Sequence, residues 1–172
     1  FGTNHLDALD ADFLGVEYFP QAVFEQNDAI REYCLGNFNN LLRRVSFGPA
    51  MMIWLNTTRS RKQAPNENFP RELMELFTMG VDTYSQDDVV AASKAFTGYN
   101  TDGYQTNYLF DYRRGEGEYW QAYHDFGHKT FLGKSGYHSG DDIISIILKT
   151  IAAATKKVKI VTNAMKKLRT VI

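Results

Sequence analysis

The sequence predicts a mainly α fold, namely a helical domain with a small β-hairpin near residues 104–131. Apolar residues recur at three- and four-residue steps along most of the chain, which is the period of an amphipathic helix. Glycine, proline and capping residues divide this pattern into separate segments. The stretch 104–131 departs from it, because its tyrosines, phenylalanines and glycines are typical of strands joined by a loop.

The composition indicates an ordinary globular domain rather than a disordered chain. The chain has 172 residues, of which 44% are hydrophobic, and a domain of about 150 residues buries roughly 70% of its unfolded surface. The longest apolar run, residues 50–55, is far shorter than the roughly 20 residues of a transmembrane helix. Cys34 has no second cysteine to pair with, and its apolar helical surroundings favour a core position.

The formal net charge of −1 hides a strong asymmetry. Residues 143–172 contain seven bases and no acid, whereas the first 142 residues contain 12 bases and 20 acids. The two regions therefore attract each other, or the basic region attracts another acidic partner.

The N-terminal half contains several predicted helices. Residues 1–14 form an amphipathic helix end before a turn. Residues 26–47 form two helices, because Gly36 and Asn37 interrupt the apolar period. Residues 49–56 are apolar all round and begin with proline, which predicts a short buried helix.

The clearest helix is predicted over residues 66–80. Asn66 or Asn68 can cap it, and Gly80 can end it in a left-handed conformation. Pro70 requires that the helix begin near Asn68, because a proline deeper inside would remove a backbone hydrogen bond. Its apolar stripe is Phe69, Leu73, Leu76 and Phe77.

Three further elements follow. Ser85 is a predicted N-cap for a helix that begins at Gln86 and has acids in its first turn. The two predicted strands read YLFDY and EYWQAYHD, on either side of the loop RRGEG. The last helix begins near Asp141.

This last helix has an apolar stripe at alternating steps of four and three residues. Three interpretations are open: the helix packs on the domain with a solvated basic face, self-associates through residues 147–172, or binds an anionic surface. Nucleic acid is the least favoured partner. The stripe comprises Ile147, Ile151, Ala154, Val158, Val161, Met165, Leu168 and Ile172.

A first candidate site lies on the helix near Asn68. Glu67, Arg71 and Glu75 are four residues apart and share a face, with Glu72 on its flank. If this face is buried, Arg71 keeps some acids ionised and an unpaired acid shifts towards neutrality, which suits general acid chemistry. If it is exposed, the same spacing merely supports the helix.

A second candidate site is the segment HDFGHKTFLG, residues 124–133. His124, Asp125 and His128 are residue types that ligate zinc, iron or manganese. Gly127 indicates a turn instead, in which Asp125 bonds to the backbone. We therefore predict no metal site. The sequence defines no cofactor. Motifs typical of a phosphate-binding loop, a nucleophile elbow or a paired-cysteine site are also missing from the sequence.

Four phrases in order resemble the bacterial family called domain of unknown function 1800. They are LGNFNNLLRRVSFGPAMMIWLN, NENFPRELMELFTMG, YSQDDVVAASKAFTGY and HDFGHKTFLG. The resemblance covers roughly residues 26–148. It implies that residues 1–148 are a helical segment from a larger periplasmic, cell-surface or secreted protein. The match fades beyond residue 148, so the family does not explain the basic amphipathic helix over residues 149–172, which we expect to pack on the same domain. It implies no established activity.

The resemblance also favours one shared polar site. Two residues depart from the family phrases, namely Pro70 and His128. The departure at His128 weakens a metal site built on two histidines. The residues that match the family's repeated polar positions are Asn4, His5, Asn66, Glu67, Asn68, Arg71, Glu72, Glu75, His124, Asp125 and Lys129.

Two functions are consistent with these residues. The first is a non-catalytic scaffold or binding module in which they form a buried polar network, and whose partner is the rest of a larger parent chain or a neighbouring protein. The alternative is a hydrolase-like extracytoplasmic enzyme with Glu72 or Glu75 as acid or base. In that enzyme Arg71 binds an anionic group, and His124 with Asp125 completes the site. Spacing alone shows no substrate pocket, which favours the scaffold.

Overall fold

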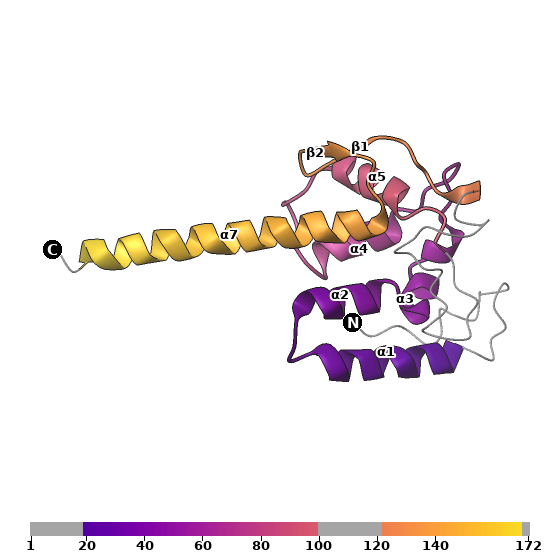
Figure 1. Cartoon of the computed structure of the whole chain (residues 1–172), viewed down its shortest axis with the longest axis horizontal. Helices are drawn as coiled ribbons and strands as arrows, with labels where there is room; N and C mark the ends of the chain where they lie inside the picture. Colours follow the sequence, from indigo (N-terminus) through magenta and orange to yellow (C-terminus); the bar gives the residue numbers. More distant parts are fainter. Residues whose placement is uncertain (1–18, 100–121, 170–172) are drawn as a thin grey trace.

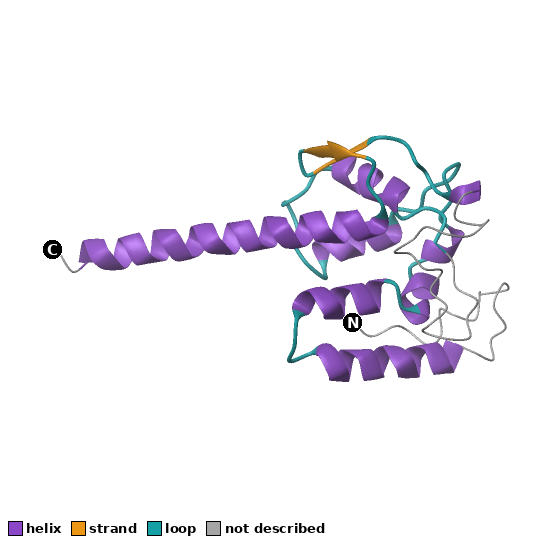
Figure 2. Cartoon of the chain, in the orientation of Figure 1, coloured by secondary structure: helices purple, strands orange, loops and turns teal. Residues whose placement is uncertain are grey.

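The computed structural model describes residues 19–99 and 122–169 and is mainly helical with one small antiparallel hairpin (Figures 1 and 2). The predicted fold class is therefore confirmed. The elements are α1 (Phe19–Tyr33), α2 (Phe38–Ser46), α3 (Pro49–Trp54), the 3₁₀ turn η2 (Thr57–Arg59), α4 (Asn68–Glu75), α5 (Gln86–Ala95), β1 (Lys129–Phe131), β2 (Lys134–Gly136) and α7 (Gly140–Arg169).

The first three helices begin and end where local signals place them. The side chain of Asn37 accepts a hydrogen bond from the Asn39 amide at 2.8 Å, which caps α2 and separates it from α1. Pro49 is the first residue of α3, where a missing amide hydrogen costs nothing. The prediction of a core position for Cys34 was wrong. Helix α1 ends at Tyr33, so Cys34 lies just beyond the helix and is exposed.

Helix α4 begins at Asn68, as Pro70 required, but it ends at Glu75 rather than near Gly80. Asn66 is not the N-cap residue of α4, because Glu67 occupies that position. The Asn66 side chain instead accepts a hydrogen bond from the Asn68 amide at 2.9 Å in the turn before the helix. Gly80 has φ +83° and its amide bonds back to the Met74 carbonyl. Because the helix stops early, Leu76 leaves the buried stripe and is 68% exposed.

The hairpin lies later in the chain than predicted. Lys129 pairs with Gly136 and Phe131 with Lys134, in antiparallel register. Residues 100–121, which contain most of the predicted strands, lie outside the described residues, and residues 122 and 123 are helical. The hairpin packs on α5, where the Leu132 amide donates to Asp88 at 2.7 Å.

One apolar core joins α2 to α5 and the first turns of α7. Its aromatic centre comprises Phe47, Phe69, Phe96 and Tyr99, with Phe69 and Phe96 edge to face at 4.9 Å between ring centroids. Ile143, Ile144 and Ile147 are fully buried on the α7 side. The core therefore anchors the start of the last helix to the body of the domain.

Beyond its first turns, α7 projects away from the domain (Figure 1). Arg43 of α2 forms an ion pair with Asp141 and donates to the Ser145 hydroxyl at 2.7 Å, which fixes the base of the helix. Along the predicted stripe, Ile147 is buried, but Val158 is 64% exposed. No helix in the described part of the chain is long and apolar enough to span a bilayer.

Candidate functional site

The loop before α4 is hydrogen-bonded to two distant segments, one through Ser60, which is buried, and one through Lys62. The Ser60 carbonyl accepts from the Gly98 amide at 2.9 Å, and its hydroxyl accepts from the Asn66 amide at 3.1 Å. The Lys62 amide donates to the Tyr123 carbonyl at 2.8 Å. The loop, the end of α5 and the segment before β1 thus form one connected structure.

His124 lies inside this connection and is only 3% exposed. Its Nδ1 is 2.7 Å from the Thr97 carbonyl, which can only accept, so Nδ1 carries the proton. Burial lowers the pKa of His124 to about 4, against the opposing effect of the Thr97 hydrogen bond. The ring is therefore neutral at pH 7, and it packs edge to face on Phe126 at 4.7 Å.

Gly98 approaches His124 more closely than any other residue type would allow. Its φ is +79°, and a Cβ placed there would lie 2.7 Å from the His124 amide nitrogen and 3.0 Å from its Cα. Both the backbone angle and the lack of space require glycine at this position.

Asp125, Gly127 and Lys129 form a closed turn behind His124. The Asp125 amide donates to the Thr97 hydroxyl, and the Asp125 side chain accepts from the Gly127 amide, both at 2.7 Å. Lys129 Nζ donates to the carbonyl oxygens of Asp125 and Gly127 and lies 3.5 Å from the Asp125 carboxylate. The Lys129 side chain is 2% exposed, and burial lowers its pKa. The turn interpretation of Asp125 is thus observed.

A second polar group joins α4 to the start of α5. Arg71 donates to Glu67 at 2.8 Å and to the Gln86 side-chain oxygen at 3.0 Å, and Gln86 donates to Glu67 at 3.0 Å. The side chains of Arg71 and Glu67 are 39% and 38% exposed. This closed triangle is therefore a surface cluster, unlike the buried turn at His124.

Tyr84 brings the remaining acids of α4 to the same surface. Its hydroxyl donates to Glu75 at 3.0 Å. The pKa of Tyr84 is raised, first by burial and then by this hydrogen bond, with a further contribution from Glu72 and an opposing one from Arg71. Tyr84 therefore stays protonated as a donor beside two carboxylates.

The predicted site residues thus fall into two groups. Glu67, Arg71, Glu72 and Glu75 lie on the α4 surface, and His124, Asp125 and Lys129 lie in the buried turn. Asn66 is the predicted residue that reaches towards the second group, through Ser60. Asn68 is exposed and contributes its amide to the turn before α4. Asn4 and His5 lie outside the described residues.

The structure adds partners that the sequence analysis missed: Ser60, Tyr84, Gln86 and Thr97. Tyr84, Gln86 and Thr97 lie inside one of the phrases that carry the family resemblance, and that was the available signal. His128 turns away from His124 and packs on Tyr137 at 5.4 Å. Among residues 19–99 and 122–158, no three His, Cys, Asp or Glu side chains come together as a metal site.

Comparison with protein families gives one match. A family described as "Protein of unknown function (DUF1800)" matches residues 15–159, a range that includes the α4 surface and the buried turn. No curated protein and no solved structure matches the chain.

Proposed function

This chain belongs to the DUF1800 family, and we propose that it serves there as a helical scaffold or binding module held together by a buried polar network. The polar network connects the loop before α4, the end of α5 and the segment that leads into β1. Its members are Ser60, Asn66, Thr97, His124, Asp125 and Lys129. The single observation that carries the proposal is the buried ammonium group of Lys129, which donates to the carbonyl oxygens of Asp125 and Gly127 in the adjoining turn.

A catalytic group must reach a substrate, and His124 and Lys129, the two basic side chains of the network, are buried. Lys129 donates to two carbonyl oxygens of the turn and lies beside the Asp125 carboxylate, which also accepts from the Gly127 amide. His124 donates a hydrogen bond from Nδ1 to the Thr97 carbonyl oxygen, and its ring stays neutral. These bonds stabilise one arrangement of the backbone, because a buried polar group without a partner costs about 1–3 kcal/mol.

The proposal is tested by Lys129→Met, with Lys134→Met on the paired strand as the matched control. Lys134 is exposed, so its replacement should change the free energy of unfolding by less than about 0.5 kcal/mol. Lys129→Met should lose about 2–4 kcal/mol, because the carbonyl oxygens of Asp125 and Gly127 lose their donor and the Asp125 carboxylate loses its ion pair. Equal stability of the two variants in urea unfolding would remove the support for a structural network.

The alternative, a hydrolase-like enzyme, is favoured by one observation on the α4 surface. Arg71, Glu72, Glu75 and Tyr84 lie close together at a partly exposed position, where an anionic group could meet a guanidinium beside two carboxylates. Glu72→Gln and Glu75→Gln should then each abolish turnover in a screen of ester, peptide and glycoside substrates. Turnover that survives in both folded variants would exclude this assignment.

We also propose an extracytoplasmic location and a partner in the rest of a larger parent chain or in a neighbouring protein. Family membership supports both proposals. Fractionation of cells that express the parent protein, with antibodies to this region, tests the location; recovery in the cytoplasmic fraction would contradict it.

A third proposal is self-association through residues 147–172. It is supported by the length of α7, about 45 Å for its 30 residues, and by its exposed apolar positions beyond the core. Sedimentation equilibrium of the purified chain tests it, since a monomer at every concentration would contradict it.

A further inference from the structure

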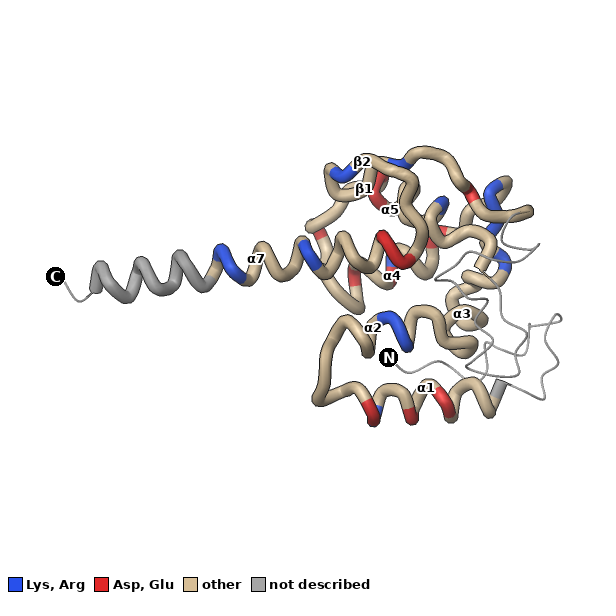
Figure 3. The backbone as a smooth tube through the Cα atoms, viewed as in Figure 1, with Lys and Arg blue, Asp and Glu red and all other residues tan. Residues whose placement is uncertain are grey.

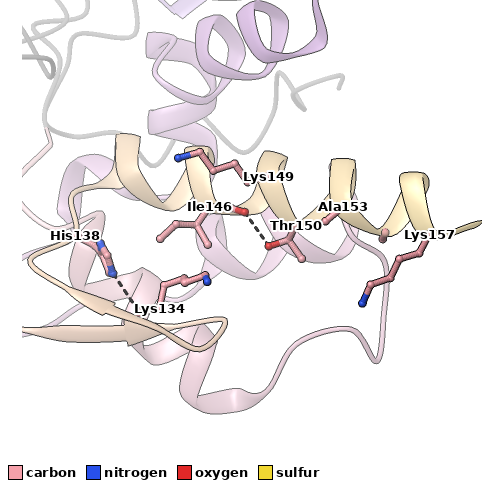
Figure 4. A pocket seen from close by; sticks show the side chains of 8 residues that line it. Lys134, His138, Ile146, Lys149, Thr150, Ala153 and Lys157 are labelled. Carbon is pink, nitrogen blue, oxygen red and sulfur yellow. Dashed lines mark hydrogen bonds between the residues drawn. The ribbon is translucent and has the colours of Figure 1, made fainter.

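A groove of about 670 Å³ lies between the hairpin and the projecting part of α7 (Figure 4). Its apolar floor is formed by Ile146, Ala153 and Ala154 of α7. Its remaining wall comes from Lys134 on β2 and His138 in the following turn, whose ring bonds to the Lys134 carbonyl at 3.0 Å. The groove thus follows the side of α7 that faces the hairpin.

The groove is strongly basic at its rim. Lys134, Lys149 and Lys157 line it, and none of its lining residues is acidic. In Figure 4, Lys134 and Lys157 extend from the hairpin and the helix towards the space below α7. An occupant must therefore combine apolar side chains with carboxylates at a matching spacing.

The outer face of α1 has that combination. Its inner face packs on α2 and α3 through buried alanines. Its outer face carries Phe24, which is 58% exposed, with Asp28 and Glu32 exposed beside it and Glu25 half-buried at its edge. Arg31 is also exposed and forms an ion pair with Asp28 at 3.8 Å, so the four charged residues leave a net negative charge on this helix. Figure 3 shows the acidic positions of α1 in red. Leu35, just beyond the helix, is 99% exposed. Phe24 and Leu35 are thus the large apolar side chains that this segment offers to a partner, with acids beside Phe24.

We propose that the groove of one copy binds the outer face of α1 of a second copy. Glu25 and Glu32 are seven residues apart, roughly 10.5 Å along the helix, and Lys149 and Lys157 are eight apart, roughly 12 Å. Lys157 extends into the groove and Lys149 extends from the opposite side of α7 (Figure 4). A helix packed along α7 therefore meets Lys157 directly, and the long Lys149 side chain has to swing round to meet the second carboxylate. Phe24 then covers the alanines of the groove floor.

This inference rests on the proposed self-association and names its surfaces. Contact between two grooves is disfavoured, because it brings lysines against lysines without an acid between them. Contact between α1 and the groove is heterologous, and each copy has one of each surface. Association therefore need not stop at two copies.

The test is sedimentation equilibrium of the whole chain and of two charge-reversal variants. One variant is Lys149→Glu with Lys157→Glu, and the other is Glu25→Lys with Glu32→Lys. Each alone should raise the dissociation constant at least about tenfold, since like charges then face one another. An equimolar mixture should restore association, because every contact is again between opposite charges. Lys62→Glu, an exposed lysine in the loop before α4, is the control and should associate like the original chain.

The remaining outcomes separate this inference from the proposed self-association. Association that persists unchanged in both variants would overturn the pairing of α1 with the groove while self-association stands. A monomeric original chain would overturn both. Binding to vesicles of anionic phospholipid without self-association would overturn the pairing and assign the groove to a membrane surface. If circular dichroism shows that a reversal unfolds the chain, Lys149→Gln with Lys157→Gln replaces it, with a smaller loss of association expected.

Discussion

Replacing Gly98 by alanine tests the contact on which the buried network depends. The structure supplies its own controls, because Gly80, Gly98 and Gly133 all have positive φ, at +83°, +79° and +71°. A Cβ at Gly80 or Gly133 would meet nothing within 4 Å, whereas a Cβ at Gly98 would meet the His124 backbone at 2.7 Å. The three alanine variants therefore separate backbone strain from crowding.

The expected magnitudes follow from these two effects. A left-handed alanine costs roughly 1–2 kcal/mol, and this is the whole cost at Gly80 and Gly133. At Gly98 the His124 backbone must also move, which adds about 1–3 kcal/mol for overpacking. That movement strains the bonds from Thr97 to His124 and Asp125. We expect Gly98→Ala to lose about 2–5 kcal/mol in total, a large part of the roughly 5–15 kcal/mol that holds a domain folded.

Urea unfolding monitored by circular dichroism measures all three variants on one scale. The Gly98→Ala midpoint should fall well below those of Gly80→Ala and Gly133→Ala, with a similar slope. If the three variants unfold at the same urea concentration, the close approach of Gly98 to His124 is not a constraint, and the network argument loses its geometric basis.

Three further predictions follow from individual contacts. The pKa of His124 is about 4 in the folded chain and about 6.5 in the unfolded chain, so the unfolded chain binds more protons between these two pH values. The contribution of neutral His124 to the free energy of unfolding is therefore complete above about pH 6.5. It falls by roughly 2 kcal/mol by pH 5. His124→Gln should flatten this part of the pH profile of unfolding; an unchanged slope would contradict the assignment. Arg71→Ala should lower stability by only about 0.2–1 kcal/mol, because the Arg71–Glu67 pair is partly exposed, and a loss above about 3 kcal/mol in calorimetry would show that the cluster is buried. Ser85→Ala removes a capping box with Asp88 and should cost about 1 kcal/mol, whereas Ser135→Ala on the exposed edge of the hairpin should cost less than half of that in the same urea assay.

Much of the helical arrangement was predictable because its signals are local. Asn37, Pro49 and Ser85 each act on amides within three residues, so the sequence alone places the starts of α2, α3 and α5. Four-residue spacing likewise placed Glu67 beside Arg71. The end of α4 was misjudged, because an apolar stripe continues past the point where the backbone turns.

The candidate site was predictable residue by residue but not as an arrangement. The family phrases identified His124, Asp125 and Lys129, but their partner Thr97 is 27 and 28 residues earlier than the first two. A hydrogen bond across that separation depends on how α5 packs against the hairpin, and no local spacing encodes it. The expectation of one shared site therefore became two groups, one buried and one on the surface.

The helical class, most helix starts and the residues of the polar network can be read from the amino-acid order, because capping, periodicity and charge act between near neighbours in the chain. Which of those residues are buried depends on the packing of the folded chain. It places Lys129 inside and Arg71 near solvent, and it leaves the outer faces of α1 and α7 uncovered. Burial is a property of segments that come from far apart in the chain, so it sets the pKa of His124, and it decides which acids and bases remain exposed to meet a partner.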